Sequence, residues 1–141
     1  MSDGNVPMAI KQGQEAHDTP QSGGLGIVTG IGKHNTPATR IWTGKTSNKP
    51  GTRSLPHHHG EAETGAYVLS GHARLFFGED FADHIDLTAS DYLFVPAHVH
   101  HIEANMSTTE KLAWLVSRAP GDIVVNLPDV DDASLQGFRR A

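Results

Sequence analysis

Cysteine is absent from the 141 residues, and its absence removes several kinds of site at once. The chain can form no disulfide, offer no thiolate to a metal ion and use no cysteine nucleophile. No run of apolar residues approaches the ~18 that a membrane-spanning helix needs. The N-terminal residues also lack the basic and then apolar order of a signal peptide. We therefore expect a soluble, cytoplasmic protein without a membrane partner.

Positive charge is also scarce. The chain has 11 lysine and arginine residues against 16 aspartate and glutamate residues, which gives a formal net charge of −5. Nucleic acids and anionic membranes select basic surfaces, so this acidic chain is a poor candidate for binding either. The expected partner is instead a small-molecule substrate.

Glycine and proline, by contrast, are plentiful, with 15 and 8 residues spread along the chain. They help to separate nine segments of strand length that are rich in valine, isoleucine and aromatic residues. Sustained helical periodicity is missing, so the pattern predicts an all-β sandwich or barrel. The segments are residues 25–31, 39–46, 65–71, 72–78, 84–89, 91–96, 101–106, 111–118 and 122–127.

The length fits a single domain. We expect an N-terminal arm over residues 1–24, a barrel over residues 25–127 and a C-terminal tail over residues 128–141. Within the barrel, Gly71 lies between two predicted strands and can take a positive φ, which predicts a hairpin turn there.

The tail carries an acidic run, Asp129, Asp131 and Asp132. The run lacks the glycine and the terminal glutamate of a calcium-binding loop. We therefore expect it to be solvated.

Histidine is the unusual residue type, because six of the ten histidines fall in two clusters, residues 57–59 and 98–101. Side chains alternate along a strand, so His57 and His59 point to one face and His58 to the other. Two neutral imidazoles suit a transition-metal ion but need a third ligand from elsewhere. The second cluster supplies the candidates His98, His100 and His101.

The clusters lie within two longer patterns. The first, from Gly51 to Gly71, is G-x5-H-x-H-x3-E-x7-G, and the second, from Ser90 to Asn105, is S-x5-P-x-H-x2-H-x3-N. They closely resemble the two signature motifs of the cupin superfamily, G-x5-H-x-H-x3,4-E-x6-G and G-x5-P-x-G-x2-H-x3-N. The chain resembles small, single-domain RmlC-like cupins, which implies a cupin-type double-stranded β-helix, or jelly-roll barrel, with a metal ion inside it.

Matched residue by residue, the resemblance implies His57, His59 and His101 as metal ligands. The fourth ligand is open, because Glu63 fits the shorter spacing after His59, whereas the count back from the closing glycine gives Thr64. The site is either three histidines with Glu63, which the spacing favours, or three histidines with open water positions. One divalent ion (Fe, Zn, Mn or Ni) is the expected cofactor.

Two residues depart from the second motif, since Ser90 and His98 stand where the family pattern has glycine. His58 and His100 are expected to contact solvent or, at most, to support the ligands by hydrogen bonds.

An ion held by three or four protein ligands keeps positions open for chemistry. The resemblance implies a metal-dependent enzyme acting on a small, oxygen-rich organic molecule, and we expect a dioxygenase that oxidises or cleaves an enolisable substrate. The alternatives are a non-redox isomerase, lyase or cyclase and a non-catalytic ligand-binding cupin. Glu103 and Tyr67 are the candidate acid–base residues.

Three arginines, Arg40, Arg74 and Arg118, lie in predicted strands. Each is expected to be exposed, although one that entered the barrel would bind an anionic substrate. Sheet faces and edges left open in a small barrel need covering, so we also expect a homodimer.

Overall fold

The computed structural model describes residues 6–17 and 24–140. All nine predicted strands are present, and three further strands of two residues each, β3, β4 and β12, join them. The two helices among the described residues are single 3-10 turns, η1 (Glu79–Phe81) and η2 (Asp132–Leu135). The strands are β1 (Gly26–Ile31), β2 (Trp42–Asn48), β3 (Thr52–Arg53), β4 (His57–His58), β5 (Glu63–Ser70), β6 (His72–Phe77), β7 (Asp83–Thr88), β8 (Tyr92–Val95), β9 (Ile102–Asn105), β10 (Leu112–Ala119), β11 (Val125–Asn126) and β12 (Arg139–Arg140).

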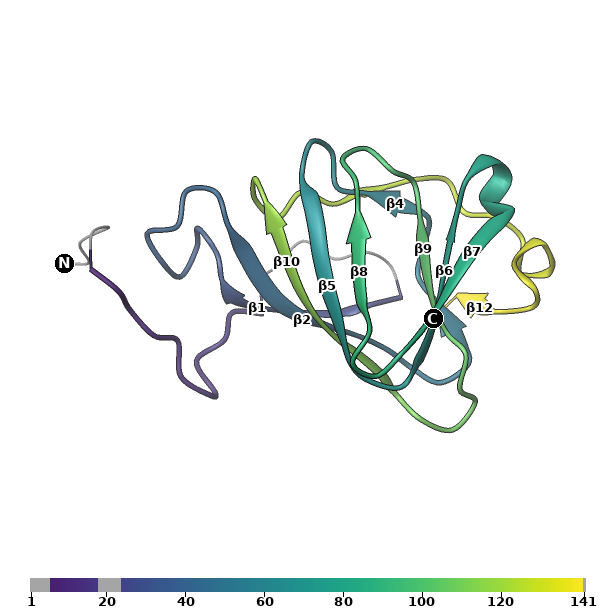
Figure 1. Cartoon of the computed structure of the whole chain (residues 1–141), viewed down its shortest axis with the longest axis horizontal. Helices are drawn as coiled ribbons and strands as arrows, with labels where there is room; N and C mark the ends of the chain where they lie inside the picture. Colours follow the sequence, from purple (N-terminus) through teal and green to yellow (C-terminus); the bar gives the residue numbers. More distant parts are fainter. Residues whose placement is uncertain (1–5, 18–23, 141) are drawn as a thin grey trace.

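Two five-stranded sheets form the barrel (Figure 1). One has the strand order β1-β2-β10-β5-β8 and the other the order β12-β3-β9-β6-β7, while β4 pairs with β11 in a small third sheet. All neighbouring strands pair antiparallel except β12 and β3. The predicted all-β jelly-roll barrel is confirmed.

The core lies between the two sheets because the strands alternate buried and exposed residues. In β10, Leu112, Trp114 and Val116 are buried, while Leu115 between them is exposed. Burying such a set stabilises the barrel by about 25 cal/mol for each Å² of apolar surface removed from water. The main cluster contains Ile27, Trp42, Ala66, Val68, Ala73, Leu87, Leu112, Trp114 and Val116.

The prediction of a hairpin at Gly71 is wrong. The strands on either side of this glycine belong to different sheets, since β5 pairs with β10 and β8 whereas β6 pairs with β7 and β9. Gly71 has a φ of 100°, so the glycine conformation is used, but to turn the chain from one sheet to the other.

The C-terminal segment is part of the barrel and not a solvated tail. Leu135 is fully buried in a second apolar cluster with Phe76 and Ile102, on the outer side of the sheet that contains β6 and β9. Two of the acidic residues accept hydrogen bonds from the fully buried Arg53, Asp129 at 2.9 Å and Asp132 at 2.9 Å. Asp129 and Asp132 thus balance the positive charge of the buried Arg53 guanidinium.

Of the expected N-terminal arm, residues 1–5 and 18–23 lie outside the described residues. The first described residues extend away from the barrel (Figure 1), residues 10–12 line a hollow with residues of β1, β2 and β10, and Ala16 forms an isolated β-bridge with Thr29. No helix among the residues that the structure describes is long and apolar enough to cross a bilayer.

Replacing Gly71 with alanine should destabilise the fold. A Cβ there would approach the Leu112 Cα and the Lys111 carbonyl oxygen to 3.0 Å each, and its φ of 100° disfavours any side chain. We expect Gly71→Ala to lower the free energy of unfolding by about 1–3 kcal/mol in a urea melt. The control is Gly65→Ala in β5, where a Cβ meets nothing within 4 Å. Equal stability of the two variants would contradict this account.

Candidate metal centre

The two histidine clusters meet because their backbones pair. His57 and His101 form an isolated antiparallel bridge, in which the His57 N–H donates to the His101 carbonyl at 3.1 Å and the His101 N–H to the His57 carbonyl at 2.9 Å. Directly paired residues place their side chains side by side. The two ring centroids are 4.4 Å apart.

His59 completes a group of three. It lies two residues after His57, and its ring centroid is 5.1 Å from each of the other two rings. The ligand atoms of the three histidines all lie within 4.8 Å of one another, and all three side chains are buried. The structure therefore brings together the histidines that the spacing predicted.

The orientation of each ring is held by a backbone carbonyl. A carbonyl oxygen can only accept, so Nδ1 must carry the proton, and in a neutral ring Nε2 keeps its lone pair. Metal-binding histidines are commonly oriented in this way. The Nδ1–carbonyl distance is 2.8 Å in every case, to Leu55 for His57, to Ile123 for His59 and to Val99 for His101.

Burial disfavours the protonated form of His59 and His101. Desolvation lowers the pKa of His59 to about 2, and the nearby Arg118 charge acts in the same direction. Burial, together with His57, likewise lowers the pKa of His101. Neutral imidazoles that converge through Nε2 are the donor set of a divalent transition-metal ion, and the cluster fits metal binding.

A carboxylate, that of Glu103, lies beside the histidine cluster. Glu103 in β9 points inward, with Oε1 3.4 Å from His101 Nε2 and Oε2 3.5 Å from His57 Nε2. Burial alone would raise the pKa of Glu103, but the interactions with His57 and His101 outweigh it and hold the pKa well below its usual value. Of the two predicted acid–base residues, Glu103 is thus brought to the cluster, as an ionised group.

Glu63 and Tyr67 are not brought to the cluster. Both lie in β5, where Thr64 and Ala66 face the interior and Glu63 is exposed on the opposite face. Tyr67 shares this outer face, and its hydroxyl donates to the Ser90 Oγ at 3.1 Å. Strand alternation therefore gives the interior position to Thr64, and the expectations for Glu63 as ligand and Tyr67 as catalyst need correction.

Arg118 is a further candidate for a functional residue. Its expected position at the surface is wrong. Its side chain points into the barrel and is only 4% exposed, with its guanidinium 4.4 Å from the centre of the Trp42 ring. The alternation of β10 contained the signal, because Trp114, Val116 and Arg118 are two residues apart and share a face.

These groups surround a small enclosed cavity. Its volume is about 10 Å³ for the centres of water-sized spheres, which is roughly what one water molecule needs. The polar residues that line it are Thr46, His59, Thr64, His101, Glu103, Trp114 and Arg118.

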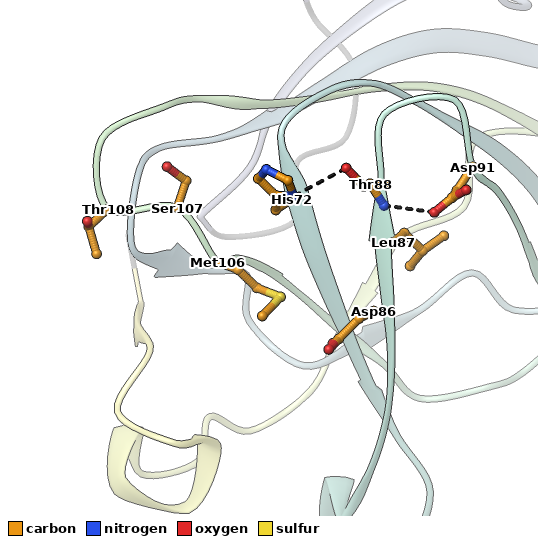
Figure 2. Close-up of a pocket in the computed structure, with 8 residues that line it drawn as sticks. All are labelled: His72, Asp86, Leu87, Thr88, Asp91, Met106, Ser107 and Thr108. Carbon is orange, nitrogen blue, oxygen red and sulfur yellow. Dashed lines mark hydrogen bonds between the residues drawn. The ribbon is translucent and has the colours of Figure 1, made fainter.

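A larger hollow of about 640 Å³ lies elsewhere on the surface (Figure 2). Some of its polar groups bond to one another, since Thr88 Oγ1 is 3.2 Å from His72 Nδ1 and the Thr88 N–H donates to Asp91 at 2.8 Å. The hollow is lined by His72, Asp86, Leu87, Thr88, Asp91, Met106, Ser107 and Thr108.

The remaining clustered histidines form a separate, more exposed group. His58 stacks on His100 with ring centroids 5.2 Å apart, and His98 lies 6.5 Å from His58. His98 has a φ of 64° and Ser90 a φ of 77°, so both residues that replace a motif glycine adopt the left-handed conformation.

Comparison with known proteins supports the same architecture. The sequence model of the family described as "Cupin domain" matches residues 46–118. No curated protein gives a significant match.

Several solved structures share the fold. An uncharacterised double-stranded β-helix protein from Klebsiella pneumoniae superposes with a TM-score of 0.64 at 18% identity, over 80% of this chain and 92% of that one. The polyketide cyclase RemF from Streptomyces resistomycificus gives 0.65 at 18% identity, over 87% and 89%. A mutant of Bacillus subtilis oxalate decarboxylase gives 0.64 at 23% identity, over 78% of this chain but 30% of that enzyme.

Removing one imidazole should abolish metal retention. We expect protein purified without chelator to carry about one divalent ion per chain by elemental analysis, and His101→Ala to lose it, because two imidazoles are too few for a tight site. The matched control is His58→Ala, whose ring lies outside the cluster and which should retain the metal. Glu63→Ala should retain it as well. Stoichiometric metal in His101→Ala would overturn the site.

Proposed function

Since the chain belongs to the cupin domain family, we propose that it is a metal-dependent enzyme acting on a small, oxygen-rich organic molecule. One observation carries the proposal: three buried imidazoles converge beside a partly buried carboxylate whose pKa is held well below its usual value. Removing such polar groups from water costs stability, and an apolar core would fill the same space at less cost.

His57, His59 and His101 would hold the ion through Nε2. A divalent ion there supplies Lewis-acid polarisation of substrate oxygens and, as iron, electron transfer with dioxygen. Glu103 adds a negative charge beside the three neutral rings. This charge favours a divalent cation over a neutral occupant of the same space.

Glu103 also has a role in proton transfer. Its lowered pKa keeps the carboxylate ionised at neutral pH, so it can accept a proton but not donate one, and the low pKa also makes it a weak base. Apolar side chains at the cavity wall, Leu93, Val95 and Val116, keep bulk water away from it. A substrate with an acidic C–H or O–H next to a carbonyl group fits this base.

The reaction that we propose is oxidation or oxidative cleavage of an enolisable substrate by dioxygen. Three histidines can support this chemistry when iron is bound, much as two histidines and a carboxylate do. Deprotonation by Glu103 would prepare the electron-rich enolate that reacts.

A second candidate is a non-redox lyase, isomerase or cyclase. It is favoured by the same base, because proton abstraction beside a Lewis acid suffices for such reactions without oxygen. A polyketide cyclase and an oxalate decarboxylase occur among proteins of this fold, but their similarity extends to the fold alone.

We also propose that the predicted homodimer forms through the outer face of the sheet β1-β2-β10-β5-β8. Tyr92 is 79% exposed and Phe94 61%, and the register sets Leu115, Tyr67 and Tyr92 side by side across three strands. A second copy of the chain would cover this apolar strip.

Oxygen dependence distinguishes the two reactions. Chelator-treated protein is loaded separately with Fe(II), Zn(II), Mn(II) or Ni(II) and tested with diketones, catechols and keto acids. We expect oxygen uptake with Fe(II), and we expect Glu103→Gln to lower turnover by about 10²-fold or more while keeping the metal. The control Glu110→Gln alters an exposed carboxylate and should not lower turnover. Turnover that persists without oxygen supports the non-redox reaction, and inactivity with every metal contradicts the enzyme.

The dimer is tested by size-exclusion chromatography with light scattering. We expect twice the chain mass of 15.1 kDa. Tyr92→Glu should yield monomer, because a charge would be buried in the apolar strip. The control Ile85→Glu places the same charge on β7, at a residue that is 44% exposed in the other sheet. A wild-type monomer would contradict the dimer.

A further inference from the structure

Arg118 has no hydrogen-bonding task within the described part of the chain. Its Nε and Nη1 atoms are buried and find no partner among the residues of ranges 6–17 and 24–140. The packing of the guanidinium on the Trp42 ring holds its orientation without satisfying these donors.

Such a group is costly, since a buried charge without hydrogen bonds loses its hydration without compensation. Arg53 shows how this chain treats a structural arginine, because its guanidinium donates to two carboxylates and three carbonyl oxygens. Arg118 lacks an equivalent set. Burial lowers its pKa to about 10, while Glu103 and Asp122 act in the opposite direction, so the charge persists at neutral pH.

Two neighbours present further polar atoms to the same cavity. Trp114 Nε1 and Thr64 Oγ1 are buried and likewise have no hydrogen-bond partner within the described ranges. The indole N–H and the guanidinium can only donate, and the hydroxyl can do so. Unsatisfied donors on one cavity wall call for an acceptor that the protein itself does not supply.

We propose that Arg118, Trp114 and Thr64 form a carboxylate-binding subsite beside the three-histidine cluster, and that the substrate is therefore a small carboxylic acid. The link to a substrate rests on the proposed function, whereas anion binding by this subsite does not. The planar, forked guanidinium matches the two oxygens of a carboxylate.

Size and charge favour a carboxylate over a bulkier anion. The cavity is small, so a planar group enters with less movement of Leu93 and Val95 than a tetrahedral phosphate needs. Apart from the histidines, Glu103 and Arg118 are the ionisable side chains that line the cavity, one an acid and one a base. A divalent cation bound by the histidines would leave positive charge in excess, which attracts an anionic substrate.

Tryptophan fluorescence provides a readout that does not depend on activity. The chain has two tryptophans, Trp42 against the Arg118 guanidinium and Trp114 in the cavity wall, so a bound anion should change their emission. Chelator-treated and Zn(II)-loaded protein are each titrated with acetate, with the neutral isostere acetamide and with inorganic phosphate. We expect saturable binding of acetate that is at least tenfold tighter than that of the other two.

The variants separate charge from hydrogen-bond geometry. Arg118→Met should weaken acetate binding at least tenfold and leave the zinc content unchanged, and Arg118→Lys should bind acetate more weakly than wild type because the fork is lost. The matched control Arg74→Met removes an arginine that pairs with Asp86 on the surface, and it should bind acetate like wild type. If Arg118→Met does not fold, Arg118→Lys and the acetate–acetamide comparison in wild type decide.

The outcomes distinguish this inference from the proposed function. Equal binding of acetate and acetamide, equal binding of acetate and phosphate, or wild-type affinity in the Arg118 variants would overturn the carboxylate subsite, whatever the metal content. Acetate binding that depends on Arg118 in protein that takes up no metal would support the subsite and count against the metal-dependent enzyme.

Discussion

The backbone pairing of His57 with His101 is the contact on which the site depends. It joins two segments that are more than forty residues apart in the chain, and it sets two imidazoles side by side before any metal is bound. His59 points the same way as His57 because side chains alternate along a strand. Glu103 points the same way as His101 for the same reason, since it lies two residues later, in β9. One pair of hydrogen bonds thus positions the four side chains of the candidate site, and the two sheets hold that pair in place.

The barrel interior divides into an apolar part and a polar part. Toward one end of β10, Leu112 and Trp114 pack in a core that stabilises the fold, whereas Arg118 at the other end faces the histidines. The polar part is unfavourable for stability, since it holds charged and unsatisfied groups away from water. Such a concentration of costly groups in one place is typical of a functional site, and the apolar core offsets its cost.

The sequence predicted those features of the structure that depend on residues close together in the chain. Strand positions, the all-β class and the three histidines all follow from alternation and motif spacing. The partner sheet of each strand does not, which is why the link at Gly71 was mistaken for a hairpin. The sequence also did not predict the burial of Arg118 or the pairing of Asp129 with Arg53. Charged residues are expected at the surface, and only contacts between distant parts of the chain reveal the exceptions.

The choice between Glu63 and Thr64 shows how a motif can mislead when its register shifts by one residue. The spacing after His59 favoured the carboxylate, but a strand offers its interior only at every second residue, and Thr64 takes that place. Glu103 reaches the histidines from the opposite sheet instead. A carboxylate therefore does lie beside the imidazoles, but it comes from β9 and not from β5, and only the pairing of distant segments reveals this.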